Sequence, residues 1–176
     1  MALSIATIEG SASDEHLFSL IQGELSRLLP GEEGGDPGDF LRRLSQLPVG
    51  FQAMAAMYQL DVSMALDDFG CHFYNWHHRG YIENQIWALH ELEANEEADL
   101  FAEAYRLAQP YWEQIEAHED FRAFCAWYNE SRLHEALLPL NKKMWELCSR
   151  PGREKGMLHY WTDYARKYPE RLQRGN

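Results

Sequence analysis

Apolar residues recur at three- and four-residue steps along most of the chain, which is the spacing of one face of an α-helix. The first such segment follows Ser11 and Ser13, either of which can cap a helix, and it ends at Pro30. A longer helical pattern covers residues 49–74, where alanine and methionine are frequent and β-branched residues are few. Further helical segments are predicted at residues 40–47, 81–92, 95–108, 119–129, 132–138, 140–148 and 157–168.

Turn-forming residues separate these segments. The glycine-rich run at 31–38 is a loop by composition, and Pro139 and Pro169 are expected to end helices. Pro110 suits the first position of a helix. Asn95 is a good capping residue, and the carboxylates that follow it favour the positive end of the helix that it begins.

The absence of a strand pattern decides the fold class. No segment alternates apolar and polar residues over six or more positions with enrichment in β-branched side chains. We therefore predict an all-α fold, a compact bundle of seven to nine helices with no significant β-sheet. The chain, 176 residues long, can bury a core as one domain, 1–176. Within it, residues 1–37 are expected to form an N-terminal helix and loop arm, and residues 38–176 a core with a basic C-terminal segment.

Charge is distributed unevenly along the chain. The whole chain has 28 acidic and 16 basic side chains, a net charge of −12. Residues 1–141 hold 24 acids and 7 bases, a net charge of −17, whereas residues 142–176 hold 4 acids and 9 bases, a net charge of +5. An acidic body repels nucleic acid and membrane surfaces and attracts basic proteins. The same acidity is consistent with a purely solubilising role, in which the basic segment folds back onto the body.

Cysteine content and hydropathy indicate the compartment. Cys71, Cys125 and Cys148 lie far apart and form no CxxC pair, so a disulfide framework and a zinc knuckle are not expected. The N-terminus has no basic residue followed by a long apolar run. No stretch approaches the roughly 18 apolar residues of a membrane span. The sequence predicts a cytoplasmic protein with no membrane association.

One cluster of side chains could hold a metal ion: Asp68, His72, His77 and His78. Asp68 and His72 are four residues apart and would share a helix face. However, the ligand spacings of di-iron bundles and of the HExxH motif are absent, and adjacent helical residues such as His77 and His78 point in different directions. We prefer the interpretation that these are partly exposed polar residues at a helix end. A metal-binding protein or metal-dependent enzyme centred on this cluster is the alternative.

Other catalytic arrangements are missing from the sequence. No serine lies in a nucleophile elbow, and Cys125 lies in the aromatic run FRAFCAWY, which is typical of a buried structural thiol. The glycines of 31–38 lie among carboxylates and follow no strand, so they do not indicate a phosphate-binding loop. The aromatic stretches at 69–76 and 121–128 lack the basic groove of a nucleic-acid surface and are expected to pack in the core. We predict a protein that is not an enzyme and needs no cofactor.

The remaining feature is a run of acids without any base. Between Arg79 and Arg106 there are seven acidic side chains and no basic one. Carboxylates three or four residues apart on a helix are about 5–6 Å apart, and duplex DNA presents one phosphate per about 3.4 Å of axis along each strand. Such a helix could copy the phosphates of a duplex edge, although spacing alone favours acids that merely cap and solvate their helix. The candidate partner-binding surface comprises this run and two preceding aspartates: Asp67, Asp68, Glu83, Glu91, Glu93, Glu96, Glu97, Asp99 and Glu103.

Three blocks of the chain have a recognisable pattern of residues. The first, at 67–76, has a run of aromatics and an asparagine: Phe69, Phe73, Tyr74 and Asn75. The second, at 81–104, has small and apolar residues: Ala88, Leu89, Leu92, Ala94, Ala98 and Leu100. The third is a C-terminal ending: Tyr164, Pro169 and Glu170. At these positions the three blocks, which together cover about residues 50–172, resemble a bacterial family of DNA-mimic proteins. The chain departs from the family where Asp67 and Asp68 stand in place of two glycines, and where Asn141 stands in place of a frequent aspartate.

The resemblance implies an all-α protein, often a homodimer, with an acidic face that occupies the DNA site of a DNA-binding protein. It would bind this basic partner through surface carboxylates, without catalysis and without contacting nucleic acid itself.

Overall fold

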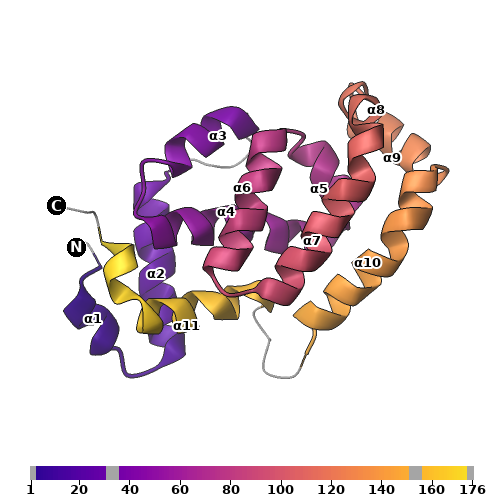
Figure 1. The fold of residues 1–176 in the computed structure, drawn as a ribbon. Helices are drawn as coiled ribbons and strands as arrows, with labels where there is room; N and C mark the ends of the chain where they lie inside the picture. Colours follow the sequence, from indigo (N-terminus) through magenta and orange to yellow (C-terminus); the bar gives the residue numbers. More distant parts are fainter. Residues whose placement is uncertain (1–2, 31–35, 151–155, 174–176) are drawn as a thin grey trace.

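The computed structural model describes residues 3–30, 36–150 and 156–173, and this part of the chain forms eleven α-helices, three 3-10 helices and no strand (Figure 1). The predicted all-α class is confirmed. The helices outnumber the predicted seven to nine because periodicity does not detect helices as short as α1 and α8, of five residues each. The helices are α1 (Ile5–Glu9), α2 (Asp14–Leu28), α3 (Pro37–Leu44), α4 (Val49–Leu66), α5 (Phe69–Asn75), α6 (Arg79–Glu91), α7 (Asn95–Ala108), η1 (Gln109–Tyr111), α8 (Trp112–Glu116), α9 (Phe121–Asn129), α10 (Arg132–Cys148), η2 (Gly156–Leu158), α11 (His159–Lys167) and η3 (Pro169–Leu172).

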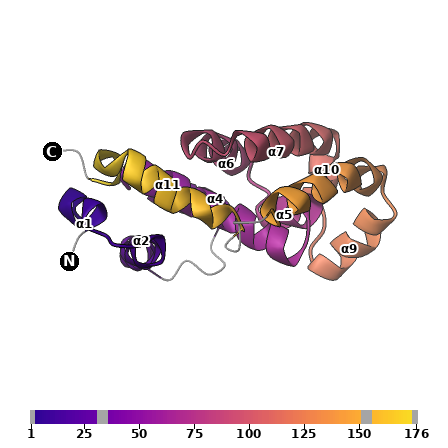
Figure 2. The same ribbon diagram turned by 90° about the horizontal axis from the view of Figure 1, so that it is seen from below.

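Helix α4 is the centre of the fold. Ten of its eighteen residues are buried, and a helix that is apolar on nearly all sides belongs in a core. It contacts α3, α5, α6, α10 and α11. Helices α6 and α7 lie side by side on one face of the molecule, and α2 and α9 lie toward the opposite face (Figures 1 and 2).

The predicted continuous helix at 49–74 is wrong at residues 67–68, because the chain turns there between α4 and α5. Asp67 follows the last residue of α4, and Asp68 caps α5 by accepting a hydrogen bond from the backbone N–H of Cys71 at 3.0 Å. The other carboxylate oxygen of Asp68 accepts from the Tyr128 hydroxyl at 2.9 Å and from Asn141 Nδ2 at 3.2 Å. The turn therefore needs no glycine at these positions, since an aspartate is a strong helix cap and has partners from α9 and α10.

The predicted helix end at Pro139 is also wrong, because α10 continues through it. Ser131 caps this helix by accepting from the His134 N–H at 3.1 Å. Pro139 lies on the exposed side of α10, whereas Leu137 and Asn141 are buried. The hydrogen bond that a proline removes is thus lost where water can replace it, while packing of the opposite side against α7 and α5 keeps the helix intact.

Asn95 does not cap α7 as predicted. Ala94 occupies the cap position, and Asn95 is the first helical residue. The side-chain oxygen of Asn95 instead lies 3.0 Å from Nδ1 of His90, at the end of α6. The asparagine therefore joins two consecutive helices across their turn.

The N-terminal helices pack against the C-terminal segment. Helices α1 and α2 contact α11 and η3, and the ring of Phe18 stacks on Trp161 with centroids 5.6 Å apart. Gln173 Nε2 donates to the Leu3 carbonyl at 3.0 Å, so the two ends of the described chain meet. Residues 31–35 of the predicted loop lie outside the described residues. No helix among those described is both long and apolar enough to cross a membrane.

Candidate functional site: two acidic regions

The base-free run of acids lies on α6, α7 and the turn between them. Glu93 in this turn has a φ of 63°, the left-handed conformation that glycine usually adopts at the ends of helices. Its N–H donates to the His90 carbonyl at 3.0 Å, and the Ala94 N–H donates to the Leu89 carbonyl at 2.9 Å. The turn is therefore closed by the usual pair of bonds but carries a charged side chain at the strained position.

A stripe of three tyrosines from the C-terminal segment lies against this run. These tyrosines are spaced four residues apart, so they project from the same side of a helix. Burial raises the pKa of Tyr164, so this hydroxyl remains a proton donor. Each hydroxyl donates to a different carboxylate: Tyr160 to Glu97 at 3.1 Å, Tyr164 to Glu91, and Tyr168 to Glu93 at 2.8 Å.

Basic side chains of the same segment add ion pairs. They join the following residues: Arg171 and Glu91, Lys167 and Glu93 at 2.6 Å, and Arg150 and Glu96 at 2.9 Å. The hydrogen bond from Lys167 lowers the pKa of Glu93. A single exposed ion pair stabilises a protein little. We therefore expect the tyrosine hydrogen bonds and the ion pairs to hold the C-terminal segment against the run jointly.

Four of the seven acids of the run are thus held by the C-terminal segment, and we call them the partnered acids: Glu91, Glu93, Glu96 and Glu97. Glu97 is fully buried. Glu103 is paired with Arg106 on its own helix at 2.6 Å. Among the described residues, only Glu83 and Asp99 of the run are exposed without a hydrogen bond or ion pair. Four of the nine acids of the predicted surface therefore have an ion pair among the described residues: Glu91, Glu93, Glu96 and Glu103.

The two preceding aspartates have different environments. Asp68 is directed into the protein, toward α9 and α10, where it accepts the bonds from Tyr128 and Asn141. Asp67 is exposed, and its side chain has no hydrogen bond or ion pair with any described residue. Burial, and then the charges of Asp67 and Asp68, raise the pKa of the Cys125 thiol on α9.

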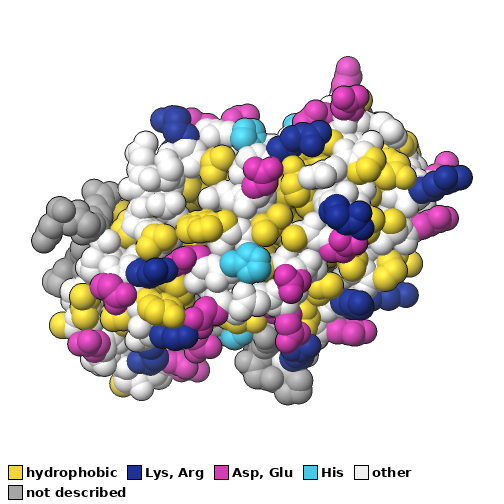
Figure 3. Space-filling view, viewed as in Figure 1, with side chains coloured by type: hydrophobic (Ala, Val, Ile, Leu, Met, Phe, Trp, Pro, Cys, Tyr) yellow, Lys and Arg dark blue, Asp and Glu magenta, His cyan; other side chains and the backbone are white. Residues whose placement is uncertain are grey.

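A second acidic region, which the sequence reasoning passed over, lies at the α8–α9 end, defined here as residues 113–135. Only two bases, Arg122 and Arg132, occur in it. The six acids are all exposed: Glu113, Glu116, Glu119, Asp120, Glu130 and Glu135. Figure 3 shows acidic side chains that project from the molecule above α8. Four of these acids, Glu113, Glu116, Glu119 and Asp120, lie between Arg106 and Arg122 without a base among them, so this shorter base-free run was visible in the sequence.

Local roles account for only two of these acids. Glu116 accepts a hydrogen bond from Trp112 Nε1 at 2.6 Å, and Asp120 caps α9 by accepting from the Ala123 N–H at 2.8 Å. Within the described ranges, no base of the C-terminal segment is bonded to any of the six. The α8–α9 end thus keeps the charge that the base-free run loses.

The residues of the alternative metal site do not converge. His72 is fully buried, with Nδ1 2.8 Å from Ser63 Oγ and Nε2 2.9 Å from Gln85 Oε1. Burial lowers the pKa of His72 to about 4, so this ring is neutral at physiological pH. Both ring nitrogens are used within the core, which leaves neither for a metal ion.

The two exposed histidines have other contacts. His77 Nδ1 lies 2.6 Å from the Tyr74 carbonyl, and His78 caps α6 by accepting from the Tyr81 N–H at 3.2 Å. In the part of the chain that the structure describes, no three His, Cys, Asp or Glu side chains are grouped to hold a metal. The geometry gives the metal hypothesis no support.

The aromatic residues singled out by the resemblance lie mainly in the core. Phe69 and Phe73 are fully buried and stack on Phe101, with centroids 5.7 Å from it in both cases. Tyr74 stacks on Phe124 of α9 at 4.5 Å, which fixes the α8–α9 end to α5. These aromatics position the acidic regions and do not form a binding platform.

Comparison with known proteins gives one finding. A family model described as DMP19-like protein matches residues 45–168. The searches of curated proteins and of solved structures returned no match.

Proposed function

Because the chain belongs to the DMP19-like protein family, we propose that it is a non-catalytic DNA mimic that occupies the DNA-binding surface of a basic protein. The family match over residues 45–168 carries this proposal, since the family takes its name from DNA mimic protein 19. The proposal includes a cytoplasmic location and a homodimer.

We place the partner surface at the α8–α9 end together with Asp67. Exposed carboxylates without an intramolecular base keep their negative potential, which steers a basic partner toward them. Asp67 adjoins this end because the next residue, Asp68, accepts a hydrogen bond from Tyr128 of α9 at 2.9 Å. The partnered acids of α6 and α7 contribute less, since the bases that a partner would supply are already present.

The experiment is capture of the partner from an extract of the source cells on the immobilised protein, followed by elution with duplex DNA. We expect the retained protein to bind DNA and to be released by the duplex, because both ligands would occupy the same surface. Salt of about 1 M should release it as well, since screening weakens attraction between exposed charges.

Inorganic phosphate at the same total phosphate concentration is the matched control, because it supplies the charge without the duplex. Release by the duplex alone supports mimicry. A retained protein that neither binds DNA nor leaves at high salt contradicts the proposal.

A further inference from the structure

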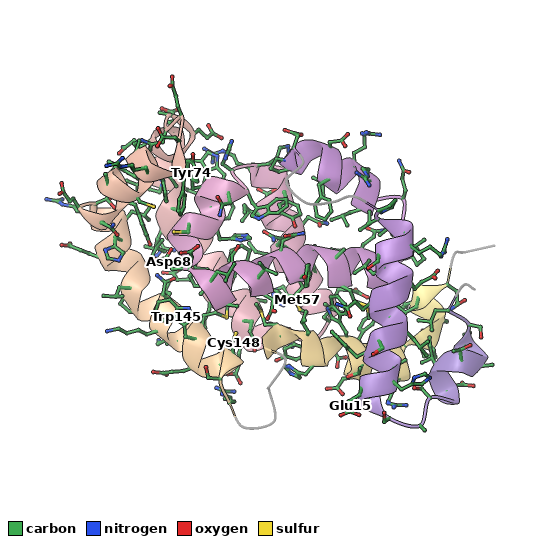
Figure 4. The ribbon with its side chains drawn as sticks, turned by 180° about the vertical axis from the view of Figure 1, so that it is seen from behind. Glu15, Met57, Asp68, Tyr74, Trp145 and Cys148 are labelled. Carbon is green, nitrogen blue, oxygen red and sulfur yellow. The ribbon has the colours of Figure 1, made fainter. Side chains whose placement is uncertain are left out.

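A hollow of about 340 Å³ lies in the corner between the C-terminal half of α4 and the C-terminal end of α5. Its volume is at the small end of the range for ligand pockets. Figure 4 shows this junction from behind, with Asp68 labelled beside it. The hollow is lined by residues of both helices and by the residue that follows each of them, among them Gln59, Val62, Leu66, Asp67, Asn75 and Trp76.

The lining combines one charge with apolar walls. Asp67 supplies a carboxylate that is exposed and makes no hydrogen bond or ion pair with the described residues. Val62 and Leu66 supply apolar surface, and Leu66 is 77% exposed, the most exposed of the large apolar residues described. An apolar side chain this exposed, next to a carboxylate without a partner, leaves both a hydrophobic and an electrostatic contact unmade.

The remaining residues accept hydrogen bonds and cations. Gln59 and Asn75 each have a side-chain carbonyl oxygen, and Asn75 is exposed. Trp76 is partly exposed and belongs to the lining, and an indole ring is the best aromatic partner for a cation. The lining therefore matches a side chain with an apolar stem and a cationic, hydrogen-bond-donating head.

We propose that this corner, the α4–α5 hollow, binds an arginine or lysine side chain of the basic partner. The inference rests on the proposed function for the identity of the partner, and on the lining for the chemistry of the ligand. The methylene stem would cover Leu66 and Val62, as long basic side chains commonly cover apolar surface. The charged head would meet Asp67 and the amide oxygens. Because Asp67 adjoins α9, the hollow forms one surface with the α8–α9 end.

The test is a titration of the isotope-labelled protein with N-acetyl-arginine amide, followed by NMR. We expect saturable shifts of the Gln59 and Asn75 side-chain amides and of the Trp76 indole N–H. N-acetyl-citrulline amide, a neutral ligand of nearly the same shape, should not shift them. In Asp67→Asn the affinity for the arginine ligand should fall roughly fivefold, the effect of one partly exposed ion pair. Asp99→Asn, which removes another exposed and unpaired acid outside the hollow, should leave it unchanged.

Three results would overturn the assignment. These are equal shifts with the citrulline ligand, an unchanged affinity in Asp67→Asn, or shifts of similar size at the backbone amides of all the exposed acids. The titration uses no partner protein, so its failure would leave the capture experiment intact. Conversely, capture could fail while the arginine ligand still binds the hollow.

Discussion

The two acidic regions of this protein have similar numbers of acids in the sequence but different environments in the fold. The base-free run has seven acids in the 26 residues from Gly80 to Tyr105, and the α8–α9 end has six acids in 23 residues. Bases and tyrosines from beyond residue 149 lie against the first region, and no described base of that segment reaches the second. The comparison shows that an acid's availability depends on what the fold brings to it, and a sequence count of acids does not report this.

The difference follows from where the C-terminal segment is anchored. Trp161, Ala165 and Leu172 are buried, so α11 and η3 are part of the core. Gly50 on α4 allows close contact, because a Cβ there would overlap Leu172 and Tyr164. Once this segment packs on α4, its tyrosine stripe necessarily faces the turn between α6 and α7. The α8–α9 end packs on α5 and lies at the other end of the molecule from α11 (Figure 1).

The largest expected effect concerns the core beneath both regions, which must be intact for them to be compared. His72 has a pKa of about 4 in the folded protein against 6.5 for the free side chain, so the unfolded chain binds the extra proton between these values. The contribution of neutral His72 to the free energy of unfolding is therefore fully present above pH 6.5. It is lost as the pH falls toward 4, by about 3 kcal/mol in total.

Urea unfolding at pH 7, 6 and 5 measures this loss. The His72→Gln variant should show a shallower decline than the unsubstituted protein, whereas His77→Gln, at an exposed position, should decline in parallel with it. Parallel declines in all three proteins would exclude His72 as the cause. The two acidic regions are best compared above pH 6.5.

The next prediction concerns the contact between α5 and α9, which holds the α8–α9 end in place. A Cβ on Gly70 would overlap the ring of Tyr128, so Gly70→Ala should push α9 away from α5 and cost about 2 kcal/mol of unfolding free energy. Gly23, in α2, has nothing within 4 Å of the corresponding position, and Gly23→Ala should stabilise by about 0.5–1 kcal/mol. Thermal or urea unfolding distinguishes the two signs. A neutral Gly70→Ala would mean that this contact is easily rearranged.

The third prediction sets the two regions against each other directly. Glu113→Gln, Glu119→Gln and Glu130→Gln combined should weaken binding to the captured partner about tenfold, because three exposed charges without internal bases are lost. A second triple variant changes the net charge by the same amount and should weaken partner binding less: Glu93→Gln, Glu96→Gln and Glu103→Gln. Titration calorimetry at two salt concentrations measures both. Equal losses would show that the partner responds only to net charge.

The smallest effect concerns the tyrosine stripe. Tyr164→Phe removes the hydrogen bond that the Tyr164 hydroxyl donates to Glu91. The free energy of unfolding should fall by only about 1 kcal/mol, because Glu91 keeps its ion pair with Arg171. Tyr58→Phe is the control, because the Tyr58 side chain is 37% exposed and its hydroxyl makes no bond with the described residues. Unfolding in urea compares the two variants. If both behave as the unsubstituted protein, the stripe covers the acids without stabilising the fold.

Periodicity predicts the class and most helices because each helix has its own apolar face. It fails where a polar residue is stabilised by distant parts of the chain. Asp68 interrupts the helical pattern only because Tyr128 and Asn141 bind it, and Pro139 is tolerated because of packing on the opposite face of α10.

The candidate site was predicted less completely for the same reason. The sequence shows where the acids stand along the chain, but the partners of Glu91, Glu93, Glu96 and Glu97 lie more than 50 residues away, as Arg150 does from Glu96. The four-residue spacing of the tyrosines was visible in the sequence and could have indicated a helix side that donates hydrogen bonds. Nothing in the sequence indicates which carboxylates it would meet.

The meeting of the chain ends has a practical consequence for attaching the protein to a support. Leu3 and Gln173 are hydrogen-bonded, and Figure 1 shows both ends of the described chain, α1 and the segment after α11, at the opposite pole from α8 and α9. A tether joined to either end therefore holds the molecule by the same pole and presents the α8–α9 end outward. Two sensors, each carrying the protein by a different end, should report the same partner affinity.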